Sequence, residues 1–398
     1  MRISTAHAND ATIERLTQRQ HALADSQLRI SNGKRVMRAS DDPIAAARAE
    51  RALASESRAA ASLRSVEASR TAMTSLEGAL GDATEQLHRV REALVASGNP
   101  AYDDSQRKVL AEQIRSMRAE LLTLANRGDG SGGFVFGGQG TNAAPFLDAA
   151  GGVQFVGTRG SATADRADGL QMTMDGAATW LMAPTGNGVF ETSSVTSTGS
   201  AWIDAGSVTN PGAITGSTYR LQFASALGVT TYSVLKDGSP TALTNVAFVS
   251  GQPISIDGMA VNVSGAPAHG DEFQMAPSTP TLSIFDALDK AATELETPLR
   301  SANAITQSQV ENLRNLDAVL GRITSARASA GVALNRIDSA GARHDTAGLA
   351  GRTERAAAED LDLTTAISEL QNLQTGYEVA LKTYASIQRL SLFDYLKT

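Results

Sequence analysis

Residues 361–398 constrain the fold more than any other stretch, because they repeat mostly apolar positions at alternating steps of four and three. A 3.5-residue period without Pro predicts a helix that packs lengthwise against a second helix. The positions that keep this spacing are Leu363, Ile367, Leu370, Gln374, Tyr377, Leu381, Tyr384 and Gln388. Chain ends are usually polar, whereas this one ends with the apolar residues Leu392, Phe393, Tyr395 and Leu396. We therefore expect a helix-pairing or assembly surface along the whole segment.

The N-terminal segment repeats this pattern and carries the opposite charge. Its spaced positions are Ile13, Leu16, Gln20, Leu23, Gln27 and Ile30. Residues 1–40 have a net charge of +4, and residues 356–398 have a net charge of −3. A surface ion pair stabilises by at most about 1 kcal/mol, so charge selects the partner more than it stabilises the pair. We expect the two terminal helices to lie side by side, either ordered only inside an assembly or stable as a pair on their own.

Composition argues against several classes of protein. The chain has no Cys, so it can form neither disulfides nor thiolate metal sites. Its net charge of −7 argues against a general nucleic-acid binder. No apolar run approaches the roughly 18 residues that a membrane span needs, so we expect no membrane insertion. Residues 1–20 are polar throughout, so we expect export, if any, without a cleaved signal peptide.

A turn and a new helix start follow the N-terminal segment. Asn32-Gly33 is expected to end the first helix, because both residues tolerate positive φ. Ser40-Asp41-Asp42-Pro43 is typical of a helix start, where Ser or Asp caps free N–H groups and Pro fits the first turn. Two adjacent Asp could also bind a metal, but the capping context favours the structural interpretation. The expected linker motif comprises Gly33, Arg35, Val36, Ser40, Asp41, Asp42 and Pro43.

The rest of the chain divides by composition. Helical periodicity is expected over about 44–97 and 104–126, and again from about 282 to about 340. Residues 131–280 hold only four Lys/Arg and ten Asp/Glu and are rich in Gly, Thr and Ser. Short alternating runs in this stretch predict strands, and Asp257-Gly258 between two of them predicts a hairpin turn. Three glycines at 341, 348 and 351 are expected to loosen the chain before the last helix.

Together these patterns predict an α+β multidomain fold. Its main part would be a long helical coiled-coil rod built from both chain ends, with a β-rich domain inserted at the far end. The expected divisions are an N-terminal arm and linker (1–42), rod helices (43–130), the β-rich insert (131–281), a returning rod helix (282–343), and a linker with the C-terminal arm (344–398).

This layout resembles the bacterial flagellin family. The most specific match is residues 31–43, SNGKRVMRASDDP, which is similar to the family's linker between its first two helices. Within the family, three segments resemble the members that join hook to filament. They are Leu124-Ala125-Asn126 with the Phe134–Gly138 and Pro145-Phe146 stretches, Gly270–Phe273, and the ending Leu390–Leu396. The helical resemblance covers roughly residues 1–147 and 282–398.

The resemblance implies a structural protein of the flagellum and not an enzyme. Its terminal helices would fold on binding and pack with other copies in an adaptor ring. The implied partners are a second hook-associated protein, flagellin and an export chaperone. The implied location is extracellular, at the hook–filament junction, after export through the flagellar type III apparatus. Two alternatives remain: flagellin itself, and an exported protein whose β insert binds or hydrolyses a ligand.

Motifs for chemistry are weak. Residues 128–133 satisfy G-x-G-x-x-G, but this loop leaves a helix and enters a strand, the reverse of a dinucleotide site. The five His are scattered without ligand spacing, and no Ser/His/Asp grouping can be defended from the sequence. We therefore expect no catalytic residue, no cofactor and no metal.

Overall fold

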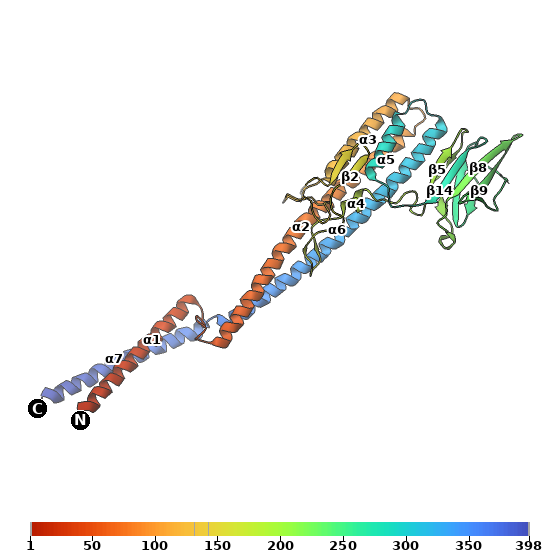
Figure 1. The fold of residues 1–398 in the computed structure, drawn as a ribbon. Coiled ribbons are helices and arrows are strands. Elements are labelled where there is room, and N and C mark those ends of the chain that lie inside the picture. The colour runs from red at the N-terminus through yellow and green to blue at the C-terminus, as the bar shows by residue number, and fades with distance from the viewer. Residues whose placement is uncertain (1, 131, 142, 397–398) are drawn as a thin grey trace. The chain divides into compact units, whose positions relative to one another are not determined.

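A computed structural model describes the backbone of residues 2–130, 132–141 and 143–396, and side chains between residues 10 and 386. Long helices occupy both chain ends, and a β-rich region fills the middle (Figure 1). The expected α+β class is therefore confirmed. The helices are α1 (Arg2–Asn32), α2 (Pro43–Ser97), α3 (Asp104–Ala125), α4 (Gly176–Trp180), α5 (Ile284–Glu296), α6 (Ala302–Glu359) and α7 (Leu363–Leu396).

The chain forms two compact units, which share α2 and α6. The terminal unit contains the chain up to Arg64 and from Gly341 onward, and the central unit is Ser65–Ala340. In the central unit, α2, α3, α5 and α6 bury one continuous apolar core. The heptad positions Leu76, Leu80 and Leu87 of α2 are fully buried there, as is Ile323 of α6. Arg327 of α6 pairs with Glu77 of α2 at 2.6 Å.

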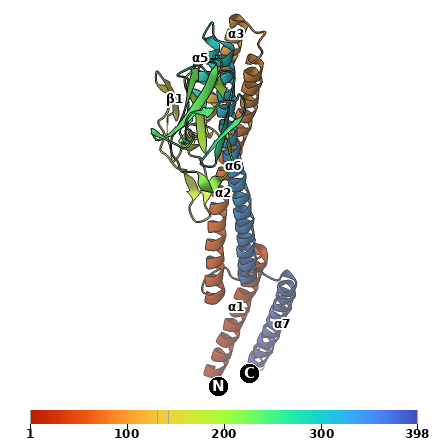
Figure 2. The same ribbon diagram turned by 90° about the vertical axis from the view of Figure 1, so that its right-hand side faces the viewer.

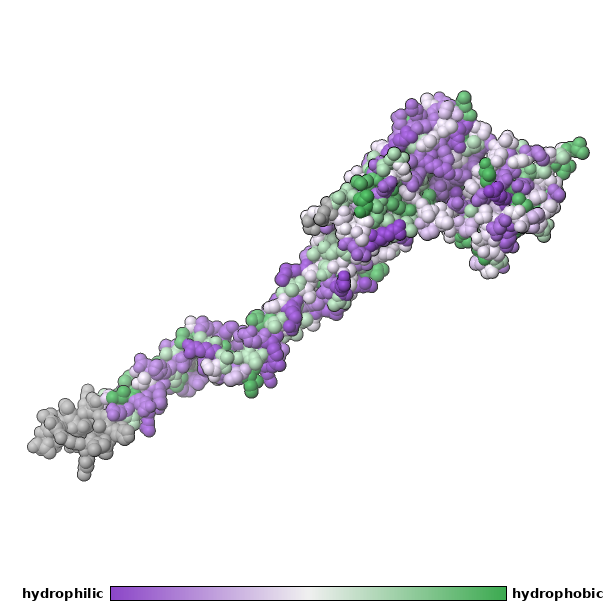
Figure 3. All heavy atoms as spheres, viewed as in Figure 1, coloured by the Kyte–Doolittle hydropathy of each residue, from purple (hydrophilic) through white to green (hydrophobic). Residues whose placement is uncertain are grey.

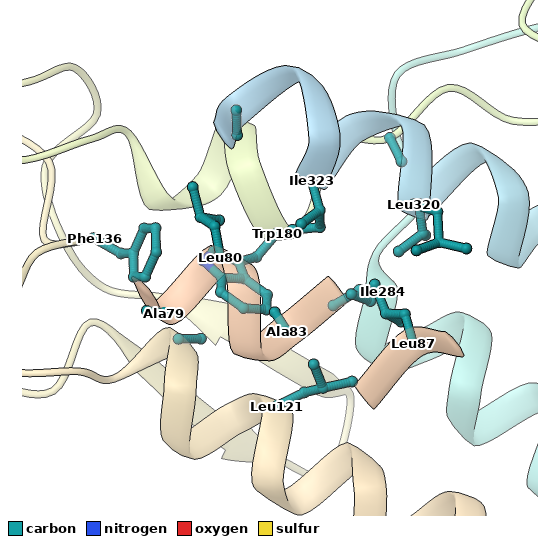
Figure 4. Packing of buried hydrophobic residues seen from close by; sticks show 14 of the residues in the cluster. Ala79, Leu80, Ala83, Leu87, Leu121, Phe136, Trp180, Ile284, Leu320 and Ile323 are labelled. Carbon is teal, nitrogen blue, oxygen red and sulfur yellow. The ribbon is translucent and has the colours of Figure 1, made fainter. Parts of the chain in front are cut away.

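The first part of the β-rich region belongs to this helical core. It contains two hairpins, β1 (Phe146–Ala149) with β2 (Gly152–Phe155) and β3 (Thr163–Asp165) with β4 (Leu170–Gln171). Figure 4 shows Trp180 of α4 and Phe136 among the side chains of α2, α3 and α6. The Trp180 ring stacks on Phe285 with centroids 6.1 Å apart and meets Phe136 edge-on at 5.3 Å. The expected insert 131–281 is thus split, because its aromatic residues up to Trp180 cover the helices.

The second part has its own core between two sheets. One sheet has the order β10-β9-β8-β14-β5 with β11 beside β9, and the other has the order β12-β13-β6 with β7 beside β13. Its strands are β5 (Phe190–Thr196), β6 (Trp202–Ile203), β7 (Ser207–Val208), β8 (Tyr219–Ala226), β9 (Val229–Lys236), β10 (Ser239–Pro240), β11 (Val246–Ala247), β12 (Pro253–Ile256), β13 (Met259–Ser264) and β14 (Glu272–Pro277). The alternating strand β8 buries Tyr219, Leu221 and Phe223 in this core.

Two turns of this β domain have clear local causes. Asp257 and Gly258 have φ of 44° and 77° and join β12 to β13, as the Asp-Gly pair predicted. Asp271 is fully buried, and its carboxylate accepts hydrogen bonds from Thr198, Gly199 and Ala268. Burial raises the pKa of Asp271, but these hydrogen bonds outweigh it and leave the pKa below its usual value. The Gly270–Phe273 segment therefore closes one end of the β domain.

The returning helix differs from its prediction at both ends. It is interrupted after Glu296, because Pro298 lacks an N–H and Leu299 adopts a φ of 56°. It then continues through the glycines that were expected to loosen the chain, as far as Glu359. In the terminal unit a Cβ at Gly351 would lie 3.3 Å from the Ala52 carbonyl oxygen. Gly351 therefore permits close packing of α6 on α2 at this place.

The aromatic cluster gives a first prediction. Trp180→Ala should lower the free energy of unfolding by about 3–5 kcal/mol, because it removes a buried indole from the core. Trp180→Phe should cost less, because the Trp180 Nε1–H is buried without an acceptor among the described residues. Urea unfolding followed by circular dichroism measures both. Val109→Ala, at an exposed position of α3, is the control and should change stability by no more than about 0.5 kcal/mol. Equal costs for all three variants would contradict the assigned core.

Candidate assembly site on the terminal helices

The terminal unit pairs α1 with α7, as the opposite charges and matching periods predicted. Figures 1 and 2 show the two helices side by side with the chain ends together, so they run antiparallel. Arg19 Nη1 donates a 2.8 Å hydrogen bond to the Gly376 carbonyl oxygen. A Cβ at Gly376 would lie 2.8 Å from the same Arg19 nitrogen, so a larger residue there would require the end of the Arg19 side chain to shift.

Only part of the expected apolar seam faces the partner helix. On α1, the side chains of Leu16, Leu23 and Ile30 are partly covered, whereas Ile13, Gln20 and Gln27 are exposed. On α7, the partly covered members are Leu370, Tyr377 and Tyr384. The other expected members of α7 with described side chains are exposed: Leu363, Ile367, Gln374 and Leu381. The side chains of Gln388, Leu392, Phe393, Tyr395 and Leu396 lie outside the described part.

The covered face of α7 keeps the predicted Leu370, Tyr377 and Tyr384 but departs from the alternate predicted positions by one residue. It uses Ala366, Leu373 and Ala380 in place of the residue that follows each of them. Small Ala side chains and Gly376 let α1 approach closely on this face. The predicted members left outside form a stripe that includes Leu363 (52% exposed), Ile367 (47%) and Leu381 (41%). We call this the outer stripe of α7.

The linker motif is held by the end of α6. The backbone N–H groups of Arg35 and Val36 both donate to the Glu359 carbonyl oxygen, at 2.7 and 3.4 Å. The Leu361 N–H donates to the Gly33 carbonyl oxygen at 3.0 Å, so the two linkers pair like short antiparallel strands. Val36 is buried at this joint. The role of the Ala358–Leu361 segment was not predicted, since it lacks a recognisable motif.

Side chains strengthen the same joint. Arg35 donates to the Ala358 carbonyl oxygen at 2.9 Å and pairs with Asp42 at 3.1 Å. Lys34 pairs with the Glu359 carboxylate at 3.0 Å. Gly33 has a φ of 67°, the left-handed conformation expected where the helix ends. The predicted linker residues Gly33, Arg35 and Val36 therefore meet at one place.

The paired Asp residues act as caps. Asp42 accepts from the Ala45 N–H at the start of α2, with Pro43 as the first helical residue. Asp41 accepts from the N–H groups of Met37 and Arg38 and closes the turn before it, which also contains Ser40. Backbone hydrogen bonds lower the pKa of both carboxyls, and for Asp42 the Arg35 guanidinium lowers it further. Asp362 caps α7 in the same way, by accepting from Thr365 and Thr364, and its pKa is lowered too.

The weak motifs for chemistry have structural explanations. In the glycine-rich loop after α3, Asp129 accepts from the Gly133 N–H at 2.9 Å, so its side chain closes the loop on itself. The Asn126 amide makes two 2.9 Å hydrogen bonds with the Phe146 backbone, which anchors the next segment. Among the described residues, no group of three or more His, Asp or Glu could hold a metal ion. No described helix is long and apolar enough to span a membrane.

The lowered pKa values give a pH prediction. A carboxyl whose pKa is lower in the folded state stabilises the fold above its ordinary value near 3.8, and this stability is lost as pH falls through the folded pKa. We expect the double variant Asp42→Asn, Asp362→Asn to keep helix capping. Its melting temperature should fall less than that of the wild type between about pH 5 and about pH 2.5. Thermal melting by circular dichroism over this range is the measurement. Asp10→Asn, an exposed change inside α1, serves as the control and should leave the wild-type pH dependence intact.

Comparisons with known proteins identify relatives of this chain. Residues 3–141 match the family described as the bacterial flagellin N-terminal helical region. Flagellar hook-associated protein 3 of Escherichia coli strain K12 is 25% identical over 403 aligned residues, which span all of both chains.

Solved structures agree with the sequence relatives. The flagellar junction protein FlgL from Legionella pneumophila has a TM-score of 0.64 and 28% identity, covering 69% of this chain and 93% of its own. FlgL from Xanthomonas campestris has a TM-score of 0.69 and 26% identity, covering 77% of this chain and 99% of its own. Residues 3–141 are therefore similar to the N-terminal helical region of bacterial flagellin, and the whole chain is similar to flagellar hook-associated protein 3.

Proposed function

We propose that the chain is a structural protein of the bacterial flagellum that joins the hook to the filament. The observation that carries this function is the full-length similarity to hook-associated protein 3. The terminal unit supplies a means: α1 and α7 cover each other on one face and leave the outer stripe of α7 on another. Flagellin, the alternative within the family, is not favoured by these relatives.

The outer stripe is the surface we assign to contact between neighbouring molecules. Burying apolar surface stabilises by roughly 25 cal/mol per Å², and helices this exposed gain little from their own chain. Neighbours that cover Leu363, Ile367 and Leu381 would therefore supply the free energy that orders α1 and α7. This role makes the exposed positions part of the function.

Finer features of this role follow as proposals. Copies of the chain form an adaptor ring, with a second hook-associated protein on one side and flagellin on the other. An export chaperone covers the terminal segments before assembly, and the chain reaches its extracellular place through the flagellar type III apparatus. The role is one of packing, so we assign no reaction to the chain. The name of the E. coli relative and the exposed stripe support this set.

Gene deletion tests the function directly. We expect electron microscopy to show bare hooks, and the culture medium to contain a separate, abundant flagellin that has not polymerised. Loss of filaments with no such protein in the medium would instead make this chain the filament subunit. Intact filaments in the deletion strain would contradict both roles.

Truncation tests the part played by the terminal helices. Removing residues 389–398 should leave a soluble protein with a folded central unit, because the two apolar cores of that unit lie within Ser65–Ala340. The truncated chain should nevertheless fail to restore filaments to the deletion strain. Thermal melting checks the fold, and a motility assay checks assembly. Filaments restored by the truncated chain would contradict the assigned role of α7.

A further inference from the structure

The central unit carries an open groove along α6, away from the outer stripe of α7. Its volume is about 790 Å³, within the range of ligand-binding pockets. Residues of α6 between Val310 and Ser325 line it at steps of three and four, so one face of this helix forms its lining. The loop Pro184–Gly188 lines the same groove. We call it the α6 groove.

The lining of the α6 groove is positively charged, although the chain as a whole is negative. It contains three Arg and a single acidic residue, Asp317, whereas the chain has a net charge of −7. Arg91 pairs with Asp317 at 3.2 Å. Arg314 and Arg322 therefore leave the lining with an excess of two positive charges. A positively charged cleft attracts anionic ligands.

The hydrogen-bond partners of these two arginines are neutral. Arg314 donates to the carbonyl and hydroxyl oxygens of Thr192, at 3.0 and 2.9 Å. Arg322 donates to the Ala178 carbonyl oxygen at 2.6 Å. Within the described part of the chain, neither guanidinium pairs with a carboxylate, and the buried Nε of Arg314 has no acceptor. Because guanidinium groups form their strongest hydrogen bonds with anions, both arginines retain the capacity to bind one.

Nearby acidic side chains do not offset the charge of Arg314. Burial lowers the pKa of Arg314 below its usual value and outweighs Glu311 and Glu191, which raise it. Glu311 is itself paired with Lys290 at 2.9 Å. A partly buried cation without a full counter-charge destabilises a fold, so a bound carboxylate would stabilise this chain.

The α6 groove also has an apolar wall, which includes Val310, Leu313 and Ala318. Hydrophobic and strongly hydrophilic residues lie next to one another elsewhere on the central unit too, as its visible face in Figure 3 shows. A small inorganic anion would leave the wall uncovered and most of the groove unfilled, because a molecule the size of water occupies only about 30 Å³. The occupant therefore needs apolar side chains as well as carboxylates.

The spacing of the two arginines indicates the form of the occupant. Arg314 and Arg322 are eight residues apart on α6, a rise of roughly 12 Å. An extended chain covers this distance in about four residues, and every second side chain points to the same face. Two carboxylates at this spacing, with an apolar side chain between them, therefore match the two arginines and the wall.

The sequence favours another protein over a second copy of this chain as the source of such a segment. Asp10 and Glu14 form the sole pair of acidic residues at positions i and i+4. Both belong to helix α1, where the same spacing spans only about 6 Å. This chain thus offers no extended segment with the required pair.

We propose that the α6 groove binds an extended segment of a partner protein, which carries two carboxylates about four residues apart and an apolar side chain between them. Arg314 and Arg322 each bind one carboxylate, and the apolar side chain contacts the wall at Leu313 and Ala318. This binding site does not depend on the proposed function, because the contact surface assigned there lies on α7.

Calorimetry with short peptides tests the site on the full-length chain. The probe is acetylated and amidated Thr-Glu-Thr-Val-Thr-Glu-Thr, which places Glu, Val and Glu on one face when extended. We expect it to bind at least about tenfold more tightly than the same peptide with Gln in place of both Glu, because hydrogen bonds between charged groups are the strong ones. Thr-Glu-Glu-Val-Thr-Thr-Thr has the same composition with adjacent Glu, and it should also bind about tenfold more weakly than the probe.

Variants of the chain locate the binding. Arg314→Gln and Arg322→Gln should each weaken binding of the probe about tenfold or more, whereas Arg336→Gln should not, because this exposed arginine of α6 lies outside the groove. Ser325→Asp adds a negative charge at an exposed position of the lining and should weaken binding several-fold. Ser329→Asp, about one turn further along α6 and outside the groove, is its matched control. Thermal melting checks that each variant is folded.

Four results would overturn the proposal. The first is absence of binding of the probe to the wild-type chain, and the second is equal binding of the Glu and Gln peptides. The third is an equal effect of Ser325→Asp and Ser329→Asp, which would place the binding elsewhere even where an arginine variant fails to fold. The fourth is binding of acetate as tight as that of the probe, because a small anion would then be the ligand. Wild-type dimers in sedimentation that Ser325→Asp abolishes would overturn the choice of partner, since a second copy would occupy the groove.

Discussion

The main-chain pairing between the two linkers is the constraint on which the terminal unit depends. Residues 33–36 and 358–361 exchange backbone hydrogen bonds, so both linkers are fixed at the same level of α6. Because α1 ends and α7 begins at that level, the two helices must run back along each other in register. Arg35 and Lys34 strengthen this joint through the side chain of Asp42 and the end of α6. Capping by Asp42 and Asp362 then starts each following helix at a fixed residue.

Sequence periodicity predicted the pairing of α1 with α7 and the covered Leu370, Tyr377 and Tyr384, but it placed the alternate covered positions one residue too late. The prediction followed the heptad spacing and so chose Ile367 and Leu381, whereas the structure covers Ala366 and Ala380. A heptad pattern identifies the apolar faces of a helix. When a helix has two such faces, the pattern does not tell which of them is covered by another helix of the same chain. Close approach of two helices favours small residues, and Gly376 lies on the face of α7 that α1 covers, where Arg19 contacts it.

The β-rich region shows a different limit. Alternation of apolar residues and the Asp257-Gly258 pair predicted strands and one turn, because these depend on neighbours in sequence. The division of the region could not be predicted in this way. Trp180 packs on Phe285, more than a hundred residues away, and no local pattern encodes such a contact. Likewise, the composition of the Gly348 and Gly351 segment is typical of a loop, yet α6 remains helical there, and Gly351 lies close to the α2 backbone.

The positions that fit single-chain folding least well share a physical explanation. Leu363 and Ile367 keep apolar surface that the described part of the chain leaves exposed. A protein that stays soluble before it assembles cannot gather such positions into one large apolar patch. A narrow exposed stripe, on a chain with net charge −7, makes each single contact between molecules weak. Many such contacts between the same molecules act together, because each one raises the effective concentration for the next. Assembly can thus be strong while no single surface endangers solubility.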